Sequence, residues 1–302
     1  MPLPTIATPT YELVLPSTKQ EIKYRPFLVK EEKLLVLALE SEDNKQVSSA
    51  IKSVIKACIL TRGIKVEELT TFDIEYLFLN IRGKSVGEEV EVNIIAPDDE
   101  TTSIPVKINL DDIQVVENEE HTKTIKLDDT LMMEMKYPSL DQFIKNNFDF
   151  TDQSNVDQSF EVIAACIDKI YSEDEVWATA DCSKKEVNDF LEQMNSMQFK
   201  EIEKFFETMP KLSHTLKVTN PKTKKKSEVV LEGLSSFFRI GMVHMDLENY
   251  FRLNFALMQY HKYSLNEIEN MMPWERDVYV ALLQQHLEEE EQKQKQQNSN
   301  AY

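Results

Sequence analysis

Apolar and polar residues follow two different periods along this chain, and the stretch 23–40 contains both. Residues 23–27 alternate charged and apolar side chains and include Pro26, whereas residues 34–39 are apolar without interruption. A proline donates no ladder hydrogen bond, so the first half predicts an edge strand that ends there. A helix that is apolar on all sides is normally buried, so the second half predicts a buried helix around which the N-terminal domain is built.

The first part of the chain mixes both periods and predicts an α+β domain over 11–137, preceded by an extended arm over 1–10. One apolar stripe at helical spacing consists of Val47, Ala50, Ile51, Val54, Ile55 and Cys58. Another helix is expected over about 70–82. Alternating patterns predict the hairpins of a small antiparallel sheet over 11–27, 89–110 and 122–136.

From residue 138 the helical period dominates, and we predict a mainly α-helical C-terminal region with one short β-hairpin. An apolar stripe from Phe160 to Tyr171 predicts one helix, and a second is expected from Val187 to Met209. The predicted segments are a helical domain over 138–212, a β-hairpin insert over 213–233, a C-terminal helical region over 234–287 and a disordered acidic and glutamine-rich tail over 288–302.

Charge and composition restrict the possible partners. Fifty-three acidic against 34 basic residues give a net charge of −19, which repels nucleic acid and anionic membranes, so we expect neither as a partner. Only five glycines occur in 302 residues, which disfavours the loops that hold phosphates. The three cysteines lack paired spacing and the first residues lack a signal pattern, so we expect a protein made in a reducing cytosol.

Candidate chemistry is sparse. Gly83-Lys84-Ser85 matches the end of a phosphate-binding loop, but Phe78 stands where that loop needs a glycine, so we interpret Gly83 as a helix stop before a strand. The five histidines are scattered, and no serine-nucleophile elbow occurs. We therefore predict no catalytic, cofactor-binding or metal-ligating residue and no enzyme activity. A hydrolase is the alternative, and it would need a pocket that brings a histidine within hydrogen-bond reach of Cys58, Cys166 or Cys182.

An aromatic-rich stripe near the C-terminus is the strongest candidate for a binding surface. Residues 247–258 show helical spacing, and Pro273 can open a further helix. Such a stripe can pack within its own core or fill the groove of another protein, and the sequence leaves both open. The candidate interface residues are Leu247, Tyr250, Phe251, Phe255, Met258, Trp274 and Val278. The lysines between Lys222 and Lys226 are expected at a solvated hairpin tip, with an acidic partner surface or the acidic C-terminal tail of the same chain as the alternative contact.

Residues 24–33, 72–79 and 84–88 together resemble the baseplate hub protein family of T-even-like contractile-tailed phages. Residues 254–265 and 272–277 are similar to a second baseplate hub assembly protein of the same phages, fused here to the first. The resemblance implies a hub subunit or hub assembly factor that contacts other hub proteins and the tape-measure protein. It implies assembly in the host cytoplasm and leaves open residence in the virion, a role as a non-virion chaperone of the tape-measure protein, and the oligomeric state.

Overall fold

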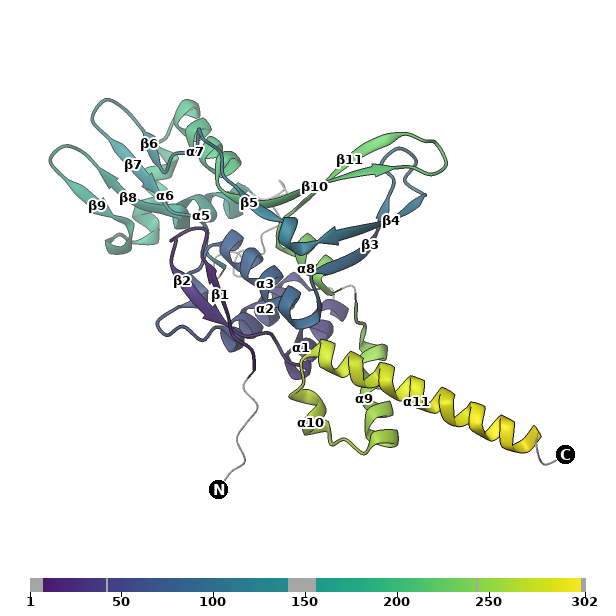
Figure 1. Ribbon diagram of the computed structural model, residues 1–302. Helices are drawn as coiled ribbons and strands as arrows, with labels where there is room; N and C mark the ends of the chain where they lie inside the picture. The colour runs from purple at the N-terminus through teal and green to yellow at the C-terminus, as the bar shows by residue number, and fades with distance from the viewer. Residues whose placement is uncertain (1–7, 42, 141–155, 243, 300–302) are drawn as a thin grey trace, which may run out of the picture.

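The protein has a main body and a smaller body inserted into it (Figure 1). The computed structural model describes residues 8–41, 43–140, 156–242 and 244–299. Strands β5 (Gln114–Val116) and β10 (Lys211–Thr219) lie far apart in sequence but pair antiparallel. The chain therefore leaves the main body after β5 and returns to it at β10, and the described residues between these strands form the inserted body.

In the main body, small antiparallel sheets surround a group of helices. Two of its helices begin where side chains satisfy backbone N–H groups: Asp43 accepts from Lys45 N at 2.9 Å, and Thr70 accepts from Asp73 N at 3.2 Å. The helices are α1 (Val29–Glu40), α2 (Asn44–Cys58), α3 (Thr71–Val86) and α8 (Leu234–Met242). The predicted hairpins are confirmed as β1 (Tyr11–Val14) with β2 (Glu21–Tyr24), β3 (Glu89–Ile95) with β4 (Ser103–Asn109), and β10 with β11 (Lys226–Glu232).

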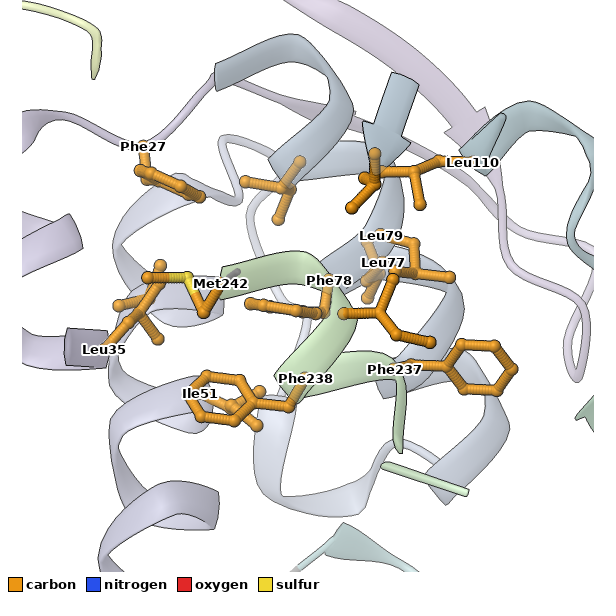
Figure 2. Packing of buried hydrophobic residues seen from close by; sticks show 14 of the residues in the cluster. Phe27, Leu35, Ile51, Leu77, Phe78, Leu79, Leu110, Phe237, Phe238 and Met242 are labelled. Carbon is orange, nitrogen blue, oxygen red and sulfur yellow. The ribbon is translucent and has the colours of Figure 1, made fainter. Parts of the chain in front are cut away.

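Helix α3 lies at the centre of the main core, where it packs closely against α8 (Figure 2). Phe78 of α3 and Phe238 of α8 have ring centroids 5.5 Å apart. The buried Arg82 donates from Nε to the carbonyl of Gly241 at 2.8 Å. A Cβ atom on Gly241 would lie only 2.8 Å from the Phe78 ring, so the absence of a side chain permits this approach.

The prediction that α1 is buried on all sides was wrong. Leu35 and Val36 are fully buried, but Leu34 is 45% exposed and Leu37 is 42% exposed. The described helices that contact α1 leave one side of it uncovered. An uninterrupted apolar run therefore gives α1 both a core face and an apolar surface stripe.

The inserted body contains one sheet, covered by helices, around its own hydrophobic core. Its elements are β6 (Thr124–Lys126), β7 (Met132–Met135), α5 (Val156–Cys166), β8 (Ile167–Tyr171), β9 (Val176–Ala178), α6 (Lys184–Glu192) and α7 (Ser196–Thr208). The strands lie in the order β6-β7-β8-β9, and each neighbouring pair is antiparallel. Tyr137 connects the two bodies through an edge-on contact with Phe72 of α3, at a centroid distance of 5.2 Å.

The fold class predicted for residues after 137 was wrong, because this region is not mainly helical with a single hairpin. The described residues form four separate sheets of two to four strands. Strands β8 and β9 fall in the segment predicted to be a helical domain, and their sheet crosses residue 137. The helix predicted to reach Tyr171 ends at Cys166, since β8 pairs with β7 from Ile167 onward. Apolar spacing at 163, 167 and 170 suits a helix, but pairing with a distant strand determines the outcome.

The long helix predicted from Val187 to Met209 is two helices, α6 and α7. The Asn195 side chain accepts from Met197 N at 2.9 Å and Gln198 N at 3.1 Å, and this cap starts α7. Gln198 returns a hydrogen bond to Asn195 N at 2.9 Å, which completes a capping box. The Asn-x-x-Gln spacing in the sequence is the signal that could have identified this break.

The C-terminal segment forms three helices that extend from the main body (Figure 1). They are α9 (Leu247–His261), α10 (Leu265–Glu269) and α11 (Pro273–Ser299). The residues from 288 onward were predicted to be disordered, but the structure continues α11 to Ser299. Glu, Gln and Lys are good helix formers, and Lys295 pairs with Glu291 at 2.6 Å one turn away.

Candidate partner interface

The candidate interface residues divide between the surface and the core. On α9, Phe251, Phe255 and Met258 are exposed, with Phe255 at 66%. On α11, Trp274 and Val278 are also exposed, the latter at 50%. The other two candidates differ: Tyr250 is 1% exposed, and Leu247 packs partly buried against the main core.

The inner face of α9 explains why its aromatic stripe points outward. Tyr250, Asn254 and Leu257 recur at helical spacing and are all buried. Asp246 begins the helix by accepting a hydrogen bond from Asn249 N at 2.7 Å. The helix therefore buries a face that includes a tyrosine and an asparagine and leaves two phenylalanines in solvent.

A buried ion pair joins the C-terminal segment to α1. The carboxylate of Glu32 accepts hydrogen bonds from Arg276 at 2.6 Å from Nη1 and 3.4 Å from Nη2. Both side chains are 0% exposed. His244 Nε2 lies 3.0 Å from the same carboxylate, and the Arg276 guanidinium lies 6.0 Å from the centre of the Tyr250 ring. These contacts fix α9 and α11 against α1 in a defined orientation.

Two further hydrogen bonds connect the start of α1 with the loop before α11. Val29 N donates to the carbonyl of Met271 at 2.9 Å, and Lys30 Nζ donates to the Asn270 side chain at 2.9 Å. The ion pair between Glu32 and Arg276 could not be predicted from the sequence, because the two residues are separated by 244 positions. No local pattern marks them as partners, since both residue types are common on helix surfaces.

The Gly83-Lys84-Ser85 motif forms no phosphate loop. All three residues lie within α3, which ends at Gly87 with φ of 138°, so the interpretation of Gly83 as the helix stop was wrong. Glycine suits this helix end, because residues with a side chain rarely adopt the backbone conformation of Gly87. Ser85 Oγ donates to the Ile81 carbonyl at 2.6 Å and accepts from Phe27 N at 2.8 Å, so it ties the chain before α1 to α3.

The cysteines lie in settings that differ from an activated thiol. Cys58 and Cys166 are buried, and burial raises the pKa of each thiol to about 12. Cys182 lines a pocket of about 350 Å³ in the inserted body, and no histidine is among the residues that line it. Its Sγ donates to the Ala178 carbonyl at 3.4 Å. Within the described ranges, no thiol has the histidine partner that the hydrolase alternative requires.

The remaining chemistry of the described residues is also limited. They contain no group of three or more His, Cys, Asp or Glu side chains placed to hold a metal ion. The described helices include none that is both long and apolar enough to cross a bilayer. The lysine cluster lies at the β10–β11 turn, where Lys222, Lys224, Lys225 and Lys226 are exposed. Asn220 and Thr223 in this turn donate to Asp98 at 2.9 and 2.5 Å, which holds the tips of two hairpins together.

Two family comparisons divide the chain at the junction between α8 and α9. Residues 8–239 match the sequence model of the T4 bacteriophage base plate protein family, and the chain belongs to that family. Residues 246–288 match the baseplate hub assembly protein Gp51 C-terminal domain. These matches confirm the resemblance and its two-part layout. No curated protein and no solved structure matches the chain.

Proposed function

We propose that this protein is a baseplate hub subunit or hub assembly factor of a contractile-tailed phage and that it acts through protein–protein contacts. The main support is the apolar surface of the segment that matches the hub assembly domain. Phe251, Phe255 and Met258 on α9 and Trp274 and Val278 on α11 are all exposed. Exposed apolar stripes of this kind are typical of surfaces that bind a partner.

The partners that fit this role are other hub proteins and the tape-measure protein, and the place of action is the host cell during tail assembly. The ion pair between Glu32 and Arg276 supports one working unit, because it joins the two family segments into a single structure. The apolar stripes would thus be presented on a rigid base. A preformed surface of this kind loses less entropy on binding than a flexible segment does.

The interface is tested by co-purification of the full chain with the hub and tape-measure proteins of the same phage. The double variant Phe251→Ala and Phe255→Ala should lose most of the captured partner. The matched control is Met197→Ala, since Met197 is an exposed apolar residue on α7 of the inserted body. Truncation after Met272 is less informative, because it removes Arg276 and so also breaks the ion pair with Glu32.

Equal capture by the double variant and the wild type would reject the α9 stripe as the interface. Mass spectrometry of purified virions then separates a structural subunit from a chaperone of the tape-measure protein. A subunit is found in mature particles at a fixed ratio to other hub proteins, whereas a chaperone is absent from them.

A further inference from the structure

The exposed apolar stripes of α1 and α9 meet, although they belong to different family segments. Lys33 of α1 has its Nζ 5.9 Å from the centre of the Phe251 ring of α9. Leu37 lies one turn beyond Lys33 on the same side of α1, and Leu34 is adjacent. On α9, Phe255 continues the stripe one turn beyond Phe251. The Lys33 contact therefore joins two stripes into one surface.

We propose that α1 and α9 form a single docking face for an amphipathic helix of a hub partner, with an apolar stripe and an acidic edge on that helix. The face consists of Lys30, Lys33, Leu34, Leu37, Phe251, Phe255 and Met258 and is named the α1–α9 face. This assignment rests on the proposed function and goes beyond it, because it adds helix α1 of the base plate segment to the binding surface and specifies the chemistry of the partner.

Two lysines at the N-terminal end of the exposed stripe of α1 indicate the acidic edge, whereas the exposed Glu40 lies one turn beyond Leu37 at the other end. Lys30 donates to the Asn270 amide oxygen, and Lys33 lies against an aromatic ring. Among the described residues, no carboxylate lies within salt-bridge distance of either lysine. In a chain with a net charge of −19, these two cations are left for an incoming carboxylate. A partner helix with Asp or Glu along one edge complements them.

The buried contacts beneath the α1–α9 face make it rigid. Tyr250 and Leu257 of α9 share a core with Leu35 and Val36 of α1, so the two helices already form one packed interface. The ion pair between Glu32 and Arg276 adds an orientation-specific contact at its base. Two helices held in this way present their outer side chains as one fixed surface, against which a third helix can pack.

Site-specific crosslinking of the full chain tests this assignment. A photoreactive phenylalanine analogue is placed at Leu37, at Phe255 or, as a control, at Met197, and the chain is co-expressed with the hub proteins of the same phage. We expect the first two positions to crosslink to neighbouring residues of one helix in one hub protein. The control position should not crosslink to that helix.

Binding measurements with the hub protein that crosslinking identifies provide a second test. The variant Leu34→Ser with Leu37→Ser should weaken binding at least tenfold, and Lys30→Glu with Lys33→Glu should weaken it more at low salt than at high salt. Leu34 and Leu37 are only 45% and 42% exposed, so circular dichroism and thermal melting check that each variant is folded at the binding temperature.

The outcomes distinguish this inference from the proposed function. Crosslinking at Phe255 with unchanged binding by the α1 variants overturns the shared face and leaves the proposed function intact. No hub crosslink at either position overturns both. A product between two copies of this chain overturns the hub partner and assigns the face to self-association.

Discussion

Helices α2 and α9 both carry apolar stripes of helical period, but they orient those stripes in opposite ways. In α2, Ile51, Val54 and Ile55 are buried in the main core. In α9, the aromatic stripe from Phe251 to Met258 faces outward, and the buried face includes the polar Asn254. The comparison teaches that periodicity identifies a helix and its faces, whereas the neighbouring elements determine which face is covered.

Buried carboxylates also differ between the contact with the C-terminal segment and the interior of the main body. Glu32, which meets the C-terminal segment, is paired with Arg276. Glu75 of α3 lies within the main body, and within the described part of the chain no basic side chain pairs with it. Burial raises the pKa of Glu75 to about 8, and the nearby charge of Glu232 adds to this effect. One carboxylate is stabilised as an ion pair, and the other is held largely neutral.

The largest effect is expected from breaking the ion pair. Arg276→Met leaves the buried Glu32 without its arginine partner, with His244 Nε2 still 3.0 Å from the carboxylate, and should lower the free energy of unfolding by about 3–5 kcal/mol. Urea denaturation followed by circular dichroism measures this change. The double variant Glu32→Gln with Arg276→Met is the control and should recover much of the loss, because no uncompensated charge remains. A single variant as stable as the wild type would contradict the structural role of the pair.

Glu75→Gln should raise stability in a pH-dependent way. The folded pKa of Glu75 is raised to about 8 from its ordinary value of 4.5, so the contribution of this group to stability is fully present below pH 4.5 and is lost as pH rises toward about 8. The advantage of the variant should be near zero at the acidic end and reach about 5 kcal/mol above pH 8, at about 1.4 kcal/mol per pKa unit. Urea denaturation at pH 5, 7 and 8.5 measures it, and a constant difference would refute the buried neutral carboxyl.

Ile51→Ala tests the buried stripe of α2. Removing these atoms from a fully buried site should lower the free energy of unfolding by about 3 kcal/mol. Lys45→Ala on the exposed side of the same helix is the matched control and should change it by less than about 0.5 kcal/mol. If both variants unfold at the same urea concentration, the stripe of α2 is not the packed face.

Phe255→Ala should have the smallest effect on stability although it removes the larger side chain. Because Phe255 is exposed, the change in the free energy of unfolding should stay within about 0.5 kcal/mol, while capture of a hub partner falls. Thermal melting and co-purification of the same sample measure the two effects. A loss above about 2 kcal/mol would show that Phe255 packs in its own core, and the contrast with α2 would disappear.

Local sequence signals predicted the early hairpins and the positions of α2 and α3, because alternation, apolar spacing and capping residues act within a few positions. They failed where two local solutions compete. Cys166 ends α5 and Ile167 begins β8 because a strand from elsewhere supplies a partner there. Asn195 is an N-cap residue in the sequence, but the apolar spacing continues across it and led to the prediction of one long helix.

The sequence by itself determined that residues 247–258 form an amphipathic helix, that the chain is strongly acidic, and which phage family it resembles. Only the tertiary structure decided that the aromatic stripe of α9 faces solvent, that Leu34 and Leu37 of α1 join it, and that Glu32 meets Arg276. The physical reason is that burial and ion pairing are properties of contacts between segments that are distant in the chain. A single segment contains the periodicity of its faces but no information on which neighbour will cover them.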